Sequence, residues 1–241
     1  MRALIMKKNG EFSSVNGYVA WDGLRLMGLE CGFFEYEQLD GLSLDKETLV
    51  YGSVGAVHKA LDKLGIPRPN LHPTPPELDP FYGRWIREST LKEVRQASEP
   101  VFVKPLRDHK VFTGYVRKNE LDDVNRSAHL DDDFAVVTAE VVSMISEWRC
   151  FIHDAKCVAA RPYAGLPTSP PPSIEVVHQC IELLAARAPI AYSIDLARLN
   201  DGRTVVVEIN DAYALGCYGM PSIPYAQMIE ARWRQMTGAV T

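Results

Sequence analysis

The stretch VVVEINDAYALGCYG, from Val205 to Gly219, decides how the rest of the chain is interpreted. It begins as an apolar β-strand, yet Glu208 and Asn210 lie on one face of that strand, because side chains two residues apart in a strand point the same way. Beyond Asp211 the chain becomes glycine-rich and leaves the strand. A strand that is expected to be buried therefore carries an acid and an amide side by side, and the preceding segment indicates why.

The segment AYSIDLARL comes just before this strand, and the two are joined through Asp201 and Gly202. Asp-Gly is a strong signal for a two-residue hairpin turn. With that turn, Asp195 faces Glu208 directly across the hairpin. The opposite face of the hairpin is then apolar and carries Ile194, Leu196, Val205, Val207 and Ile209.

Two carboxylates directly opposite each other on paired strands repel each other and destabilise the pair. A hard divalent cation would compensate, because Mg²⁺ prefers carboxylate and amide oxygens as ligands. The pattern thus suggests a metal site at Asp195, Glu208 and Asn210. A solvated polar face, on which the two acids are harmless, is the alternative that spacing alone leaves open.

The composition excludes several classes of protein. A net charge of −5 gives no basic surface for nucleic acid, and no apolar run approaches the ~20 residues of a membrane span. The apolar piece Ala3–Met6 is too short for a signal peptide and fits a first strand. The five cysteines form no Cys-x-x-Cys pair and no metal-ligand cluster, which is typical of reduced thiols in a cytoplasmic protein.

Proline and glycine divide the chain into segments. Apolar spacing predicts a helix in residues 53–66, stopped near Gly65, and six prolines between residues 67 and 80 predict a linker or an extended surface arm. Further helices are expected at 85–96, 173–187 and 223–236. Strands are expected at 101–105, 111–116, 134–142, 147–152, 156–163, 191–199 and 204–210.

These features together resemble the ATP-grasp superfamily. Asp195 followed by Glu208-x-Asn210 closely resembles the metal-binding signature of that family, and VFVKP, KVFTG and AEVVSMISEWR resemble its nucleotide-binding elements in the family's order. The resemblance covers about residues 50 to 220. Lys104, Lys110 and Arg149 together resemble the clade that is named for an arginine and two lysines.

The resemblance implies roles for these residues. Lys104 and Lys110 would contact the ATP phosphates, and the backbone from Glu140 through Val142 would read the adenine base. Glu147 would accept hydrogen bonds from the ribose hydroxyls. Taken without the family, each of these is equally explained as a solvated side chain on a strand or loop.

Two arginines are candidates for the reacting groups. The resemblance places Arg149 at a basic position that faces the phosphates or the substrate, although Arg149 and Glu147 share a strand face and an ordinary ion pair would also fit. Arg161, near the end of the next strand, is suited to bind a substrate carboxylate bidentately, and a solvated arginine fits equally well. Arg149, Arg161 and Lys110 are therefore the candidate catalytic residues.

What the resemblance implies for the whole chain is an α+β protein with an ATP-grasp fold: mainly antiparallel sheets with flanking helices, preceded by a small α/β region. The expected division is residues 1–80, an N-terminal α/β region with the proline-rich linker, and residues 81–241, the nucleotide-binding and catalytic region. The implied function is an ATP- and Mg²⁺-dependent ligase, which joins a carboxylate to an amine through an acyl phosphate.

The implied substrates are a small molecule or peptide that carries a carboxylate, together with an amine; no nucleic acid and no membrane is expected, and the oligomeric state is not predicted. A nucleotide-binding sensor or partner-binding module without turnover is one alternative, and a kinase that phosphorylates a small molecule is another. The sequence departs from the family in one respect. Many members carry a longer glycine-rich loop over the phosphates, whereas the segment from Lys104 to Gly114 contains one glycine, which is Gly114 itself.

Overall fold

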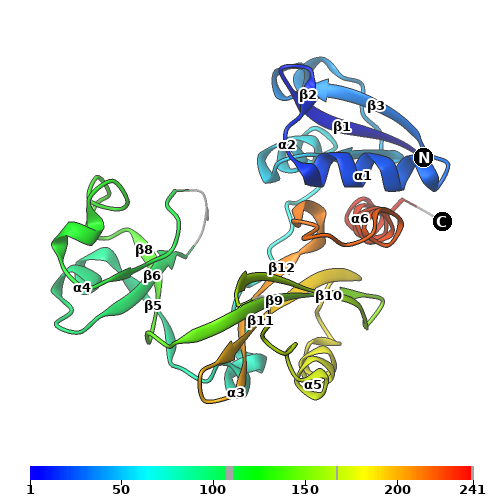
Figure 1. The fold of residues 1–241 in the computed structure, drawn as a ribbon. Coiled ribbons are helices and arrows are strands. Elements are labelled where there is room, and N and C mark those ends of the chain that lie inside the picture. Colours follow the sequence, from blue (N-terminus) through cyan, green and yellow to red (C-terminus); the bar gives the residue numbers. More distant parts are fainter. Residues whose placement is uncertain (107–110, 167, 240–241) are drawn as a thin grey trace.

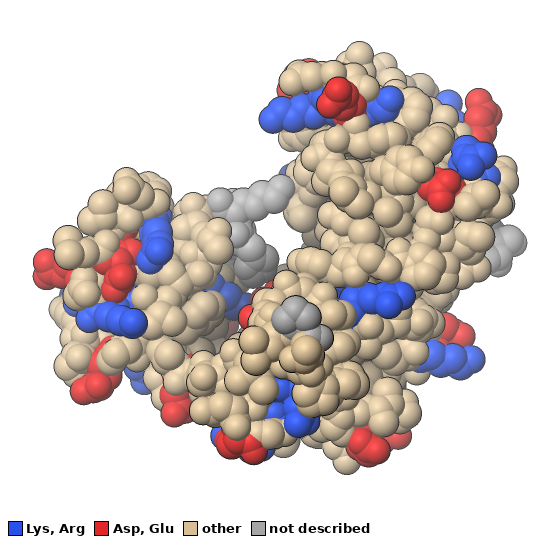
Figure 2. Space-filling view, in the orientation of Figure 1, with Lys and Arg blue, Asp and Glu red and all other residues tan. Residues whose placement is uncertain are grey.

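The computed structural model describes residues 1–106, 111–166 and 168–239, and within these ranges the chain forms three four-stranded sheets. Sheet A contains β1 to β4, sheet B contains β5 to β8, and sheet C contains β9 to β12. Sheet B forms a separate lobe, whereas sheet A lies above sheet C (Figure 1). A hollow separates the lobe of sheet B from the rest of the molecule (Figure 2).

Sheet A forms the N-terminal layer of the molecule. Its elements are β1 (Arg2–Lys8), β2 (Glu11–Phe12), α1 (Val15–Leu26), β3 (Glu30–Glu35), η1 (Tyr36–Gly41), β4 (Thr48–Tyr51) and α2 (Val54–Lys63). β1 runs parallel to β3 and β4 and antiparallel to β2. The predicted helix is confirmed: the Ser53 hydroxyl accepts from the Ala56 N–H at its start, and Gly65, just after its end, has a left-handed φ of 67°.

The C-terminal helix α6 (Ser222–Thr237) also belongs to this layer. It packs against α1 at Gly23, where a Cβ atom would lie only 2.0 Å from the carbonyl oxygen of Ser222. Tyr225 and Trp233 of α6 are buried in the same core as Leu24 of α1. The two ends of the chain therefore meet, and the loop that precedes α6 is held between sheet A and sheet C.

The proline-rich segment lies against sheet C as an ordered arm. It contains η2 (Pro76–Leu78) and α3 (Asp79–Tyr82). The Pro73 carbonyl accepts a hydrogen bond of 2.8 Å from the N–H of Ile209 in the edge strand β12, and Tyr82 is buried in the core beneath sheet C. The extended surface arm is thus confirmed, with the addition that it is attached to the strand that carries Glu208.

Sheet B is antiparallel, with strand order β5-β8-β6-β7. Its elements are β5 (Ile86–Thr90), α4 (Leu91–Gln96), β6 (Val101–Pro105), β7 (Tyr115–Arg117), η3 (Glu120–Asp123) and β8 (Ala135–Ala139).

Two predictions in this lobe are corrected. The segment 85–96 is half strand, because Ile86–Thr90 pairs residue by residue with β8, and the helix begins only after the cap at Thr90. The strand expected at 111–116 begins at Tyr115; just before it, Gly114 packs so closely on Phe102 that a Cβ would lie 2.7 Å from the ring.

Sheet C is antiparallel, with strand order β10-β9-β11-β12. Its elements are β9 (Met144–His153), β10 (Lys156–Gly165), α5 (Ile174–Leu184), β11 (Ala191–Leu199) and β12 (Thr204–Asp211), followed by η4 (Ala212–Ala214). One face packs on α5 and on the arm; its buried residues include Cys150, Ile152, Ile194 and Val206. The other face carries Arg149 and Phe151, and Phe151 belongs to the core of the N-terminal layer.

The β11–β12 hairpin pairs Asp195 with Glu208, as predicted, but by a different route. Near the turn Arg198 pairs with Thr204, so the loop is one residue longer than a two-residue Asp-Gly turn. A bulge then follows, because Asp195 pairs with Glu208 while Leu196 pairs with Val206, which leaves Val207 as the extra residue. The longer loop and the bulge shift the register by one residue in opposite directions, so Asp195 still pairs with Glu208. They also move Val206, instead of Val205 and Val207, onto the buried apolar face.

In the described part of the chain, no helix combines the length and the apolar character needed to cross a membrane.

Candidate active site

Four charged residues form a row across the four strands of sheet C. Arg161 of β10 pairs with Arg149 of β9, Arg149 pairs with Asp195 of β11, and Asp195 pairs with Glu208 of β12. Directly paired residues in a sheet place their side chains on the same face. The row therefore runs positive, positive, negative, negative over the face that meets the N-terminal layer.

The central pair, Arg149 and Asp195, is a bidentate ion pair. Nε of Arg149 donates to Oδ1 of Asp195 at 2.8 Å, and Nη2 donates to Oδ2 at 2.6 Å. Both residues are buried. Burial raises the pKa of Asp195 while the arginine opposes that rise; burial also lowers the pKa of Arg149, but the two hydrogen bonds outweigh it and the pKa lies above its ordinary value.

The outer acid, Glu208, is paired with Lys104 from the other lobe. Nζ of Lys104, on β6 of sheet B, lies 2.8 Å from Oε2 of Glu208. Burial raises the pKa of Glu208, but the attraction of Lys104 and the hydrogen bonds from Lys104 and Asn210 outweigh it, so the pKa lies below its usual value. The Lys104–Glu208 pair joins the lobe of sheet B to the row on sheet C.

The three predicted metal ligands lie together. Nδ2 of Asn210 is 3.3 Å from Oδ2 of Asp195 and 3.2 Å from Oε1 of Glu208. Two carboxylates and an amide are the oxygen donors that a hard cation takes, so this donor set fits Mg²⁺. In the described residues no cluster of three or more histidine, cysteine or acidic side chains has metal-binding geometry. Both carboxylates of this set instead form ion pairs with basic side chains, Asp195 with Arg149 and Glu208 with Lys104.

The predicted adenine hinge links the two lobes. Glu140 follows β8 of sheet B, Val142 precedes β9 of sheet C, and the Glu140 N–H donates to the Trp85 carbonyl at 3.1 Å. Val142 packs against an apolar group on the face of sheet C that carries the charged row. This group consists of Ala197, Leu199, Val205, Met144 and Val207.

The other predicted site residues make few contacts in the site or fall outside the described residues. Glu147 accepts a hydrogen bond of 2.9 Å from the Tyr163 hydroxyl instead of pairing with Arg149. Arg161 forms no ion pair within the described residues, and its Nε is buried without a hydrogen-bond partner. Lys110 lies outside the described residues.

Two tyrosines complete the site and were not assigned to it from the sequence. The rings of Tyr163 and Tyr218 stack with centroids 5.2 Å apart, and the guanidinium carbon of Arg149 lies 4.9 Å from the Tyr218 ring. Tyr218 has a φ of 43°, a conformation that non-glycine residues rarely adopt, and its neighbour Gly219 is also left-handed. The glycines around Tyr218 were the one sequence signal that this loop is bent.

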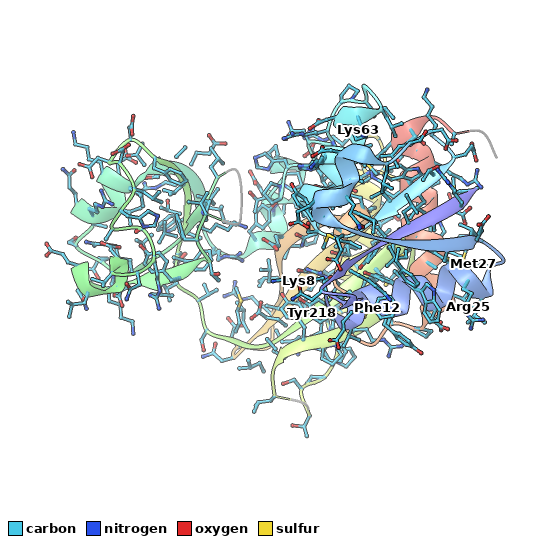
Figure 3. All side chains as sticks on the ribbon, turned by 90° about the horizontal axis from the view of Figure 1, so that it is seen from above. Lys8, Phe12, Arg25, Met27, Lys63 and Tyr218 are labelled. Carbon is cyan, nitrogen blue, oxygen red and sulfur yellow. The ribbon has the colours of Figure 1, made fainter. Side chains whose placement is uncertain are left out.

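The loop that carries Tyr218 is fixed from both sides. Oδ1 of Asn16, on α1, accepts a hydrogen bond of 2.9 Å from the Cys217 N–H. At the start of the loop, Asp211 forms a bidentate pair with Arg232 of α6, at 2.7 and 2.6 Å. In Figure 3, Tyr218 lies on the side of the N-terminal layer that faces the hollow. The N-terminal layer therefore positions the ring over Arg149.

Arg84 supports the bulge that aligns the acids, and no pattern in the sequence indicated this role. Its Nη1 donates to the Val206 carbonyl at 2.9 Å, and its Nη2 donates to the Val207 carbonyl at 3.3 Å. Burial lowers the pKa of Arg84. The arm and the bulge are thus connected one residue before Glu208.

Comparison with known proteins identifies the family of this chain. The sequence model of the family described as ATP-grasp domain, R2K clade family 2, matches residues 81–228. The match spans more than half of the chain, so the chain belongs to the R2K clade of the ATP-grasp proteins. This confirms the suspected family and the predicted fold, and with them the class of enzyme, an ATP-dependent ligase. Comparison with curated proteins finds none that matches.

Solved structures show the same fold at low sequence identity. D-alanine–D-alanine ligase from Bacillus anthracis complexed with ATP is 18% identical with a TM-score of 0.60, covering 99% of this chain and 98% of that one. The ATP-grasp ligase PsnB complexed with a minimal precursor is 14% identical with a TM-score of 0.55, covering 96% and 99%. The macrocyclase MdnC from Microcystis aeruginosa MRC, bound with the precursor peptide MdnA, is 14% identical with a TM-score of 0.51, covering 99% and 100%.

Proposed function

We propose that this protein joins a carboxylate to an amine, using ATP and Mg²⁺, through an acyl phosphate. The observation that carries the proposal is the charged row on sheet C, with Lys104 reaching it from the opposite lobe. Phosphoryl transfer depends mainly on positioning and on charge neutralisation. The row provides both where the two lobes approach each other.

The nucleotide would lie between sheet B and sheet C. The backbone from Glu140 to Val142 would read the base above the apolar group of sheet C, and Glu147 would bind the ribose after exchanging its hydrogen bond with Tyr163. Lys104 and Lys110 would bind the phosphates. Lys104 already stands beside Glu208, so it would exchange one anionic partner for another.

Asp195, Glu208 and Asn210 would hold Mg²⁺. When bound, the cation offsets the negative charge of the phosphates. Without it, the charges of the two acids are balanced by Arg149 and Lys104. This balance explains how like charges can face each other on paired strands, and it makes Glu208 available once Lys104 turns to the nucleotide.

The reaction has two steps. The substrate carboxylate attacks the γ-phosphorus of ATP, the bond to the β–γ bridging oxygen breaks, and ADP leaves. The amine then attacks the acyl carbon of the acyl phosphate, which releases phosphate and a proton and leaves an amide. Arg149 would steady the transferring phosphoryl group and Arg161 would orient the acidic substrate, both as fixed cations.

The substrate would be a small molecule or a peptide that carries a carboxylate, together with an amine. Solved relatives with this fold carry a peptide precursor in PsnB and MdnC, and one PsnB structure holds Mg and ADP (15% identical, TM-score 0.52). The five cysteines are free, which supports a reducing compartment, and we place the protein in the cytoplasm.

The test is to incubate the protein with ATP, Mg²⁺ and pools of amino acids and short peptides, and to measure ADP, phosphate and products. Phosphate release that requires an amine supports the ligase. A stable phosphorylated product instead shows a kinase, and nucleotide binding without turnover across broad pools shows a sensor or a partner-binding module. Hydroxylamine in place of the amine would trap an acyl phosphate as a hydroxamate.

A further inference from the structure

Arg161 is the one member of the charged row without a partner in the described part of the chain. Arg149 is neutralised by Asp195, and Glu208 is neutralised by Lys104. Arg161 stands directly beside Arg149 on the neighbouring strand, and its Nε is buried with no hydrogen-bond acceptor. Like charges at paired strand positions are destabilising, and a buried donor without an acceptor adds to the cost. Both features point to an anion that binds at Arg161.

Two acids at nearby positions of sheet C already have partners. Asp195 uses both carboxylate oxygens on Arg149, and Glu147, in the adjacent row, accepts from the Tyr163 hydroxyl. Neither forms an ion pair with Arg161. The missing anion is therefore expected from a ligand and not from the protein.

The position of Arg161 indicates which part of a ligand it meets. Arg161 is on β10, three strands from β12, so its Cα lies roughly 14 Å from that of Glu208 at the usual strand spacing. Lys104 and Glu208 mark the phosphate end of the row, and Arg149 lies between. A carboxylate that attacks the γ-phosphate must lie near Arg149. Arg161 is about one strand spacing, ~5 Å, further along.

The neighbours of Arg161 place it on the substrate side. Ala159 and Phe151 are paired across β10 and β9 two positions from Arg161 and Arg149, and both pack against the core of the N-terminal layer. Two residues along β10, Tyr163 stacks on Tyr218. The guanidinium is thus on the face of sheet C that the N-terminal layer covers, away from the lobe that supplies Lys104.

We propose that Arg161 binds a second carboxylate of the substrate, so that the preferred acid is a dicarboxylate, such as an acidic amino acid with a free α-carboxylate. One carboxylate is phosphorylated beside Arg149, and the other is held bidentately by Arg161, whose planar fork matches a carboxylate. This inference rests on the proposed ligase function and specifies its substrate class.

The experiment compares acids that differ by one carboxylate. Glutarate is matched with butyrate, and glutamate with 4-aminobutyrate; each is incubated with ATP, Mg²⁺ and hydroxylamine, and hydroxamate and ADP are measured. The wild type should use each dicarboxylate at least about tenfold better in kcat/KM than its partner, one charge-assisted contact being worth that much or more. R161Q should remove this preference by raising KM for the dicarboxylates while leaving KM for ATP unchanged.

Two further variants separate charge from structure. R161K keeps the charge but loses the fork, so it should restore only part of the preference. R203Q is the control: Arg203 is an exposed arginine at the β11–β12 turn of the same sheet, paired with Asp201, and its loss should leave the preference intact. Thermal melting of each variant checks that it is folded.

The outcomes distinguish this inference from the ligase proposal. Equal use of monocarboxylates and dicarboxylates by the wild type, or an unchanged preference in R161Q, overturns the inference while the ligase stands. Glutamate that raises the melting temperature of the wild type but not of R161Q, without turnover of any acid, supports the anion site and contradicts the ligase. If no dicarboxylate binds to the protein and none is turned over, the inference is overturned.

Discussion

The two ion pairs of the charged row use similar groups in very different surroundings. The side chains of Arg149 and Asp195 are 10% and 3% exposed, joined by two hydrogen bonds and covered by Tyr218. Those of Lys104 and Glu208 are 14% and 28% exposed, joined by one, and belong to different lobes. A buried bidentate pair is costly to break, whereas a partly exposed single contact exchanges readily. The first pair should support the fold in addition to its proposed roles at the metal and the phosphoryl group, and the second should serve exchange with the nucleotide.

The largest expected effect tests the buried pair. Asp195→Asn leaves the Arg149 guanidinium buried without a counter-charge, which should lower the free energy of unfolding by about 3–5 kcal/mol. Denaturant unfolding measures this directly. Arg203→Gln, at an exposed pair in the same sheet, is the control and should change stability by less than about 1 kcal/mol. An Asp195→Asn protein as stable as wild type would show that the pair does not support the fold.

The next effect tests the exchangeable pair through activity. Glu208→Gln removes the charge of a proposed metal ligand and should lower metal-dependent turnover by roughly 10²–10³-fold, the scale of losing one preorganised electrostatic contact. The free energy of unfolding should fall by less than about 1 kcal/mol, because the pair is partly exposed. ADP release and denaturant unfolding are measured on the same sample, and chelation of Mg²⁺ should reproduce the activity loss in the wild type. Wild-type turnover in Glu208→Gln contradicts the metal assignment.

A third effect, of intermediate size, concerns the cover over the buried pair. Tyr218→Ala removes the ring from Arg149 and from Tyr163, and should cost about 1–2 kcal/mol for the cation–π and stacking contacts. Tyr218→Phe keeps both ring contacts and should remain near wild type. Tyr218→Gly loses the ring but relieves the left-handed backbone, so it should be more stable than Tyr218→Ala by ~1 kcal/mol. Equal stability of the alanine and glycine variants would argue against strain at this residue.

The sequence was sufficient for the parts of the site that lie on one hairpin. The Asp-Gly turn placed Asp195 opposite Glu208, and period two placed Asn210 beside Glu208. It was not sufficient to locate the bulge, because Val205, Val206 and Val207 are identical and any of them fits the extra position equally well. The correct pairing therefore rested on two compensating one-residue errors.

Contacts between distant elements were out of reach for a different reason. The ion pair of Lys104 with Glu208 depends on how the lobes approach each other, and the stacking of Tyr163 on Tyr218 depends on a loop fixed by Asn16. No local pattern encodes either. The strand at Ile86–Thr90 shows the same limit, because pairing with β8 makes a strand of a segment for which a helix was predicted.

The smallest expected effect completes the comparison at the buried pair. The Ser193 hydroxyl lies 3.4 Å from Oδ1 of Asp195, next to the two hydrogen bonds from Arg149. If the arginine provides the main stabilisation, Ser193→Ala should cost less than about 1 kcal/mol in denaturant unfolding, because the hydroxyl adds only one long hydrogen bond to a carboxylate that Arg149 already holds, and turnover should stay within a few-fold of wild type. Combined with Asp195→Asn, its effect should shrink, because the two side chains share a contact. A loss in Ser193→Ala as large as that in Asp195→Asn would mean that the hydroxyl, and not the guanidinium, holds the carboxylate, and the contrast between the two ion pairs would have to be redrawn.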